Sequence, residues 1–274
     1  MTSIYSIDKT KFIDPSYFID THCHFDFPPF TGVETASLVS AAQVNVRQLI
    51  VPAVSAAYFP RILDLAANYP PVFAALGMHP GYIGQHQEAD LAILASHLMN
   101  KPAKLVAVGE IGLDRYIDEP QYPRQLALLH AQLKLAKEYD LPVILHSRGS
   151  HDLLASVLRK AALPRTGVVH GFAGSLAQAQ VFINLGYYIG VGGTITYERA
   201  QKTRKVMTEL PLSALLLETD APYMPLAGFQ GQPNRPERSV DVFSVLCELR
   251  PEAPFEIAIR LLENSLHLFQ LPPA

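Results

Sequence analysis

Two histidines and an aspartate lie close together near the start of the chain, at Asp20, His22 and His24. Because side chains alternate along an extended strand, these three leave the same side of it, and Cys23 points the other way. Imidazole and carboxylate groups at one strand end are suitable ligands for a metal ion. The pattern alone is a weak signal in a chain with 10 histidines, so the prediction depends on further ligands elsewhere.

Further polar residues stand at the ends of later apolar segments, where they would meet the first group. They are His79, Glu110, His146, His170 and Asp220. Each one follows a short apolar segment that has the composition of a buried parallel strand. The other histidines occupy helical or pre-helical stretches, at His86, His97, His130, His151 and His267. A lone histidine at a strand end is usually structural, but the repeated position favours a shared site.

Eight apolar segments alternate with helical patterns along the chain. The segments are residues 17–19, 49–54, 72–76, 105–109, 143–145, 168–169, 187–190 and 215–217. This order is typical of an α/β fold, either a TIM (β/α)8 barrel or a doubly wound open sheet. The barrel is favoured because these polar residues fall repeatedly at the same end of the strands, and in a barrel those ends form one rim. Two further helices close the chain, and we expect one domain over residues 1–274, with a leader at 1–16.

The composition limits the class of protein. With 49% hydrophobic and 17% charged residues, the chain is expected to be globular, and a net charge of −3 argues against a broad basic groove for nucleic acid. The two cysteines, Cys23 and Cys247, give no disulfide framework and are expected to serve packing. No apolar run has membrane-spanning length, and the leader has no apolar core. We therefore expect a cytoplasmic protein, without membrane contact, that acts as a monomer.

The candidate ligands carry only nitrogen and oxygen donors, which suit Zn, Mg, Mn or Ni. Six ligands are too many for one catalytic ion with an open position and are appropriate for two divalent metal ions. They are His22, His24, Glu110, His146, His170 and Asp220. Glu110, halfway round the rim, is the expected bridge. Two adjacent ions activate water for attack on a phosphoryl or carbonyl group, and Asp220 is the expected catalytic proton carrier. Asp20 is expected to support the histidines without binding an ion.

A set of motifs in fixed order resembles the TatD family of metal-dependent deoxyribonucleases. The motifs are Asp20-Thr-His-Cys-His-Phe-Asp26, Gly77-Met-His-Pro80, Gly109-Glu-Ile-Gly-Leu-Asp114, Pro142-Val-Ile-Leu-His-Ser-Arg148, His170-Gly-Phe-Ala-Gly-Ser175 and Glu218-Thr-Asp-Ala-Pro-Tyr223. The segment 228–237 further resembles the YjjV branch. The resemblance implies a TIM barrel, ester hydrolysis and, for several members, DNA 3′-exonuclease activity. It assigns metal binding to the same six residues and places His79 and Arg148 beside the metals as substrate contacts.

The sequence departs from the commoner family pattern in loops expected to face the substrate. Gly171 and Ala173 replace the usual Cys and Ser, and residues 234–237 read Asn-Arg-Pro-Glu. We expect a phosphodiesterase or 3′–5′ deoxyribonuclease acting on a nucleic-acid end or a small phosphodiester. The alternatives are an amidohydrolase for amides or carboxylic esters, a D-aminoacyl-tRNA deacylase, and a metal-stabilised scaffold without activity. Lys104 is the lysine nearest Glu110, which disfavours the carboxylated-lysine bridge of many amidohydrolases.

Overall fold

The computed structural model describes residues 17–274, so the predicted leader lies outside the described residues. Eight parallel strands form one sheet in which the order follows the chain from β1 to β8. The strands are β1 (Phe18–Asp20), β2 (Val46–Pro52), β3 (Val72–Leu76), β4 (Leu105–Asp114), β5 (Val143–Arg148), β6 (Gly167–Val169), β7 (Tyr188–Val191) and β8 (Leu215–Leu217).

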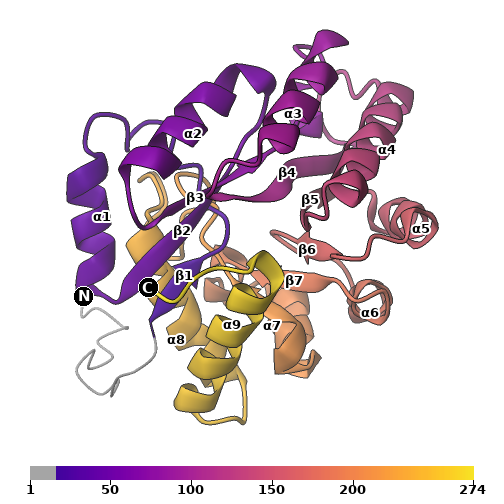
Figure 1. Ribbon diagram of the computed structural model, residues 1–274. Coiled ribbons are helices and arrows are strands. Elements are labelled where there is room, and N and C mark those ends of the chain that lie inside the picture. The colour runs from indigo at the N-terminus through magenta and orange to yellow at the C-terminus, as the bar shows by residue number, and fades with distance from the viewer. Residues whose placement is uncertain (1–16) are drawn as a thin grey trace.

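Helices α1 to α7 follow one another around the strands in chain order, and α9 lies in front of the strands (Figure 1). The α-helices are α1 (Glu34–Gln43), α2 (Phe59–Asn68), α3 (Ala89–Asn100), α4 (Tyr122–Glu138), α5 (His151–Ala161), α6 (Leu176–Asn184), α7 (Gln201–Glu209), α8 (Ser239–Leu249) and α9 (Pro254–Phe269). Short 3-10 helices are η2 (Ala56–Tyr58), η3 (Pro80–Tyr82), η4 (Gly193–Thr196), η5 (Leu212–Ala214) and η6 (Pro236–Arg238). Within residues 17–274, no helix is both long and apolar enough to cross a membrane.

The first and last strands meet and close the sheet into the predicted (β/α)8 barrel. The backbone N–H of Thr21 donates to the carbonyl of Leu217 at 3.0 Å, and the N–H of His24 donates to the carbonyl of Ala221 at 2.7 Å. Between them, the N–H of Asp220 donates to the carbonyl of His22 at 2.9 Å. The seam between β1 and β8 therefore contains three of the predicted metal-site residues.

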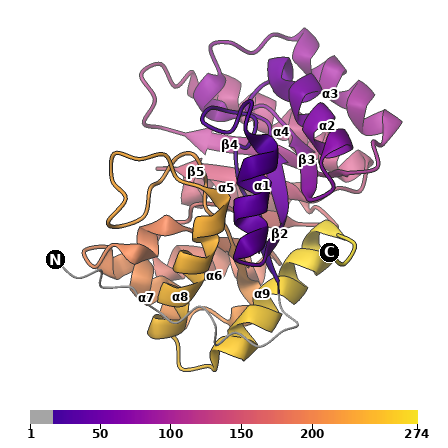
Figure 2. The ribbon, with the colours of Figure 1, turned by 90° about the vertical axis from the view of Figure 1, so that its left-hand side faces the viewer.

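Alternation along the strands divides the apolar side chains into two layers. Residues of the inner layer, such as Ile50, Phe73 and Ile144, fill the barrel and also pack against Leu268 and Phe269 at the end of α9. Residues of the outer layer face the surrounding helices, which Figures 1 and 2 show wrapped around the strands. Because Phe73 and Ile144 lie near the starts of their strands, α9 covers the amino-terminal end of the barrel. The opposite rim is left for the candidate site.

Strands β4 and β5 extend further than the sequence analysis predicted. Their pairing shifts register between Val108 and Ile111 and then continues, with Gly112 opposite His146 and Asp114 opposite Arg148. Consequently Glu110 and His146 lie inside strands and do not follow them. The prediction was wrong here because it ended each strand at the last residue of an uninterrupted apolar run. A buried carboxylate or imidazole on the inner face does not end a strand when ladder hydrogen bonds continue.

Candidate metal centre

The carboxylate of Glu110 is the centre of the cluster on the rim, and one of its oxygens faces three histidines. Its Oε1 lies 2.7 Å from Nε2 of His170, 3.0 Å from Nδ1 of His146 and 3.1 Å from Nε2 of His79. The Glu110 side chain is buried, with 2% of its surface exposed. A buried carboxylate needs compensating partners, and these are three of the five histidine nitrogens that surround it.

The other oxygen of Glu110 faces the two histidines of the first motif. Oε2 lies 3.2 Å from Nε2 of His22 and 3.5 Å from Nε2 of His24, and the two Nε2 atoms are 3.3 Å apart. Oδ1 of Asp220 is 3.7 Å from the first nitrogen and 3.6 Å from the second. All six predicted ligands are thus brought together, with His79 as a seventh neighbour.

The donor set fits divalent ions. Ligand atoms of His22, His24 and Asp220 lie within 4.8 Å of one another, as do those of His22, Glu110 and His170, and those of His79, Glu110 and His146. The Nδ1 atoms of His22, His24 and His170 are buried without a hydrogen-bond partner among the described residues. Imidazole nitrogens and carboxylate oxygens that converge at these separations are the usual ligands of Zn, Mn or Ni.

The charges of the cluster are tightly coupled. Burial opposes ionisation of Glu110, but the neighbouring His79, His170 and His22 outweigh it and hold the pKa of this carboxyl well below its usual range. Burial also opposes protonation of His170, yet Glu110 raises its pKa to about 10. By contrast, burial lowers the pKa of His79 to about 4. In the metal-free protein, a protonated His170 therefore balances Glu110, and a metal ion must displace this proton.

Asp114, to which the sequence analysis gave no role, fixes the orientation of His146. Its Oδ2 lies 2.9 Å from Nε2 of His146, and Oε1 of Glu110 lies 3.0 Å from Nδ1. Because a carboxylate only accepts, His146 donates to both in the metal-free protein, and the bond to Asp114 leaves Nδ1 as the nitrogen that can bind an ion. Burial opposes ionisation of Asp114, but the hydrogen bond from His146 outweighs it and lowers the pKa of Asp114. Glu110, Gly112 and Asp114 alternate along β4, and this alternation was the available sequence signal.

Glu218 lies behind His170. Its Oε1 accepts a hydrogen bond from the N–H of Gly171 at 2.6 Å and is 3.9 Å from Nδ1 of His170. The carboxylate lies directly over Gly190, where an added Cβ would be 2.4 Å from Oε2. Glycine at that position makes room for the Glu218 carboxylate.

Asp220 adopts a backbone conformation that few residues favour, with φ of 59°. Asp tolerates this left-handed region better than most residues. The preceding residue is held by Asp20, whose carboxylate accepts hydrogen bonds from the Thr219 N–H at 3.0 Å and the Thr219 hydroxyl at 2.6 Å. Asp20 also accepts a bond from the N–H of His22 at 3.3 Å. It therefore supports both strands of the seam.

A cavity of about 210 Å³ opens above the cluster. Its mouth includes two tyrosines, Tyr82 and Tyr223, which the sequence analysis did not single out. The ring of Tyr223 lies 5.7 Å from that of His24, and the ring of Tyr82 lies 6.1 Å from that of His79. Tyr223 ends the motif that begins at Glu218, but the sequence analysis assigned neither tyrosine a role, because their position at the cavity depends on how two rim loops meet.

The two cysteines and Lys104 lie away from this cavity. Cys23 is fully buried in the outer core layer, as alternation predicted, and burial raises the pKa of its thiol. Cys247 packs against the same layer. Nζ of Lys104 donates to the carbonyls of Tyr69 and Pro70 at the amino-terminal end of β4. It therefore has no access to the rim, where a carboxylated lysine would bridge two ions.

Arg148 lies on the rim with its side chain exposed. Its guanidinium carbon is 5.2 Å from the ring centre of Tyr116, in a cation–π contact. Arg148 follows His146 by two residues and lines a cavity with it, and its role as a substrate contact stays a prediction.

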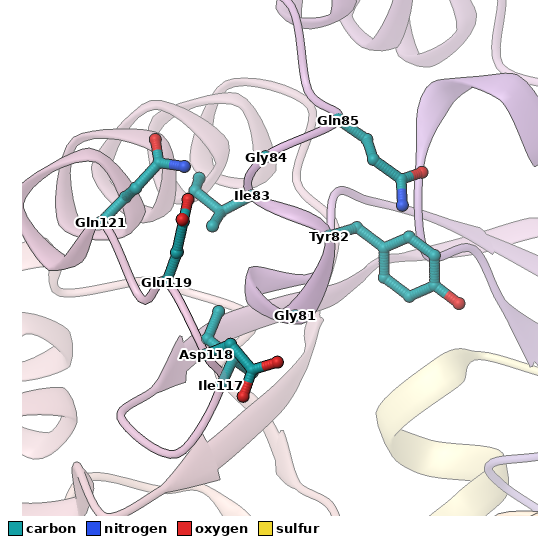
Figure 3. A pocket seen from close by; sticks show the side chains of 9 residues that line it. All are labelled: Gly81, Tyr82, Ile83, Gly84, Gln85, Ile117, Asp118, Glu119 and Gln121. Carbon is teal, nitrogen blue, oxygen red and sulfur yellow. The ribbon is translucent and has the colours of Figure 1, made fainter.

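A polar cleft of about 410 Å³ lies on the far side of Tyr82. Figure 3 shows Asp118, Glu119 and Gln121 facing the segment from Gly81 to Gln85, with the Tyr82 ring directed away from the acidic side chains. Both carboxylates are exposed. Their charge repels phosphate, so this side of the rim is unsuited to a nucleic-acid backbone.

Comparisons with known proteins agree with this geometry. A model of the family described as TatD related DNase matches residues 19–270. An Escherichia coli (strain K12) protein named Uncharacterized metal-dependent hydrolase YjjV is 64% identical over 255 residues, which are 93% of this chain and 98% of that protein. A Haemophilus influenzae protein named Uncharacterized metal-dependent hydrolase is 47% identical over 261 residues, covering 92% of this chain and 99% of its own length.

Solved structures show the same relationship. The crystal structure of Escherichia coli K12 YjjV, described as a TatD homolog, superposes with a TM-score of 0.92 and covers 93% of this chain and 98% of that one. A TatD family hydrolase from Entamoeba histolytica, 22% identical, shares the fold with a TM-score of 0.83, covering 93% of this chain and 98% of that chain. The match over nearly all of the barrel means that this chain belongs to the TatD family.

Proposed function

We propose that the protein is a two-metal hydrolase of phosphodiester bonds that acts on nucleic-acid ends. The single observation that carries this proposal is the position of Glu110, whose two oxygens face different sets of histidines. A carboxylate in this position is suited to bridge two ions. The names of the relatives, which call them metal-dependent hydrolases, and the DNase family support the same assignment.

Two groups of side chains would hold the ions. His22, His24 and Asp220 lie on the side of Glu110 Oε2, and His146 and His170 lie on the side of Oε1. Divalent ions bound there supply Lewis acidity toward a phosphoryl oxygen and lower the pKa of water. Asp114 orients His146 of the second group through a hydrogen bond, and the carboxylate of Glu218 faces Nδ1 of His170 at 3.9 Å.

Asp220 carries the proton in this proposal. Its side chain is 19% exposed and reaches the cavity, whereas Glu110 is enclosed. Burial raises the pKa of Asp220, which makes its carboxylate a better proton acceptor. Asp220 takes a proton from the attacking water and transfers it to the leaving oxygen.

The shape of the rim favours a substrate end over a long duplex. The cavity is small, and the cleft beside Tyr82 carries the exposed acids Asp118 and Glu119. Arg148, stacked on Tyr116, is the cation that lines the cavity next to the centre, where its planar fork suits a phosphate. The position of Lys104 disfavours the amidohydrolase alternative, and the open cavity disfavours a purely structural metal site.

The test uses protein that has been stripped of metal and reloaded with Mg, Mn, Zn or Ni. We expect about two ions per chain in the wild type, fewer in Glu110→Gln, and at least a hundredfold loss of turnover in both Glu110→Gln and Asp220→Asn. Elemental analysis measures the ions. Turnover is measured on a 3′-labelled single strand, on a D-aminoacyl ester and on a simple carboxylic ester.

Glu138→Gln is the matched control, because it removes the same charge from an exposed position on α4. It is expected to retain both ions and wild-type turnover. Equal ion content in Glu110→Gln and the control would refute the bridging role. Preferred turnover of the D-aminoacyl ester over the DNA strand would refute the phosphodiester assignment while leaving the metal centre intact.

A further inference from the structure

A second chamber of about 250 Å³ opens beside the metal centre. It shares His146, His170 and Asp220 with the cavity above the centre, so one substrate can reach both. The volume is below the roughly 300–1,000 Å³ of sites that enclose a whole ligand. The chamber is therefore suited to one group of a substrate whose reacting bond lies at the centre.

The chamber walls are mainly apolar. Phe172, Ile195 and Met207 are buried side chains of the core, and Met224 is half exposed at the opening. Arg148 is exposed at the rim, which leaves its charge in solvent. Burying an ionised group against such walls is costly, so the occupant is uncharged. The thioethers and the phenyl ring also favour an aromatic partner, because sulfur and ring edges attract one another.

Two small residues on the wall have no structural reason to be small. Gly192 has an ordinary extended backbone with φ of −119°, and a Cβ added there would meet Glu218 only at 3.5 Å, an ordinary contact. Ala173 is partly open to solvent and lines the same wall. The other two glycines differ, since Gly171 has φ of 54° and a Cβ on Gly193 would lie 2.9 Å from the Met224 carbonyl. Gly192 and Ala173 thus keep space open without serving the fold.

We propose that this chamber binds the uncharged ring system, a nucleobase or other aromatic group, that is attached to one side of the scissile phosphoester. The inference rests on the proposed phosphodiesterase function and adds the part of the substrate that is recognised. The phosphoryl group lies at the metal centre, and the ring lies between Phe172 and the methionines Met207 and Met224. The small residues Gly192 and Ala173 leave the space that the ring occupies.

The test is binding to the metal-loaded protein, measured by calorimetry without turnover. The ligands are methyl, cyclohexyl and phenyl phosphate and thymidine 5′-monophosphate, which share the phosphate and differ in the attached group. We expect phenyl phosphate and thymidine 5′-monophosphate to bind at least about tenfold more tightly than methyl phosphate, and cyclohexyl phosphate to bind more weakly than phenyl phosphate.

Two variants fill the chamber from different positions in the chain, so failure of one to fold does not remove the test. Gly192→Val and Ala173→Phe are each expected to abolish the preference for the ring and to leave the affinity for methyl phosphate within about twofold. Ala103→Phe introduces the same ring at an exposed alanine before β4, at the other end of the barrel, and is expected to keep the preference.

The outcomes separate the two proposals. Tight binding of methyl phosphate without any gain for the ring ligands overturns the chamber assignment and leaves the proposed function standing. Equal affinity for cyclohexyl and phenyl phosphate shows that the chamber takes aliphatic groups and overturns its assignment to aromatic rings. Absence of binding by all four phosphates overturns the proposed function together with the inference.

Discussion

Glu110 shows how much of the candidate site could be predicted from residue type and position in the sequence. A glutamate directly after an apolar run, in a chain that also places histidines after such runs, was sufficient to predict that Glu110 lies among the histidines. Its role as a bridging ligand stays a prediction. The orientation of His146 was not predictable in the same way, because it depends on Asp114, four residues beyond Glu110 on the same face of β4. Contacts of this kind require the register of two neighbouring strands, which the sequence does not specify.

At the level of single residues, the carboxylate of Asp20 joins the two strands of the barrel seam, and its removal can be tested. Removing its carboxylate in Asp20→Ala leaves the buried N–H and hydroxyl of Thr219 without their acceptor. We expect a loss of about 3 kcal/mol in the free energy of unfolding, and a smaller loss in Asp20→Asn, which keeps one acceptor oxygen. Urea unfolding of the metal-free protein measures both.

The comparison variant for Asp20 is Asp118→Ala, in which the same group is removed from an exposed loop. Its stability is expected to stay within about 0.5 kcal/mol of the wild type. Were Asp20→Ala as stable as Asp118→Ala, the carboxylate would have no structural role in the seam.

At the scale of single elements, a side chain of the loop that follows η3 holds the backbone of His79 in place. His86 is buried, and its Nε2 lies 2.8 Å from the carbonyl of His79, to which it donates. Arg124 of α4 in turn donates to the carbonyl of His86. The sequence analysis placed His86 correctly among the histidines outside the strand ends. The hydrogen bonds through which His86 links His79 to α4 are tertiary contacts, which the sequence pattern does not specify.

The ionisation of His86 makes stability depend on pH. Burial lowers its pKa below the ordinary 6.5, so the folded protein holds it neutral, whereas the unfolded chain gains a proton below pH 6.5. This contribution to stability is complete above pH 6.5 and is lost as the pH falls from 6.5 toward the folded-state pKa, by up to about 1.4 kcal/mol per pH unit.

We therefore expect metal-free His86→Gln to lose less stability than the wild type between pH 7.5 and pH 5.5. Urea titrations at the two pH values measure the difference, and His130→Gln, an exposed histidine on α4, serves as the control. Identical losses of unfolding free energy in the wild type and His86→Gln would show that His86 does not contribute to the pH dependence of stability.

On the scale of the whole molecule, the barrel was predictable because eight apolar segments alternate with helical patterns and polar residues recur at one end of six of them. What the segments did not reveal was how the barrel is filled and closed. The end of α9 packs Leu268 and Phe269 against inner-layer residues such as Phe73 and Ile144. A helix with an apolar face has many possible partners, and only the assembled barrel determines which one it covers.

A substitution at Phe269 tests how much the packing of α9 on the amino-terminal end of the barrel stabilises the fold. We expect Phe269→Ala to reduce the free energy of unfolding by about 3–5 kcal/mol, because it leaves a cavity at the amino-terminal end of the barrel. Ion content and turnover should be unchanged, since the metal centre lies at the other end. Phe255→Ala, on the same helix but 52% exposed, is the control and should remain near wild-type stability. Loss of ions in Phe269→Ala would show that the two ends are coupled.

The seam between β1 and β8 also determines the order in which the centre is assembled during synthesis. Asp20 and Thr219, which meet in the seam, are 199 residues apart in the chain. At a translation rate of about 5–20 residues per second, Asp20 leaves the ribosome roughly 10–40 s before Thr219. His22 and His24 emerge with the first strand, but their partner Asp220 emerges after the last. The nascent chain therefore cannot complete its metal centre until almost the entire barrel has been translated.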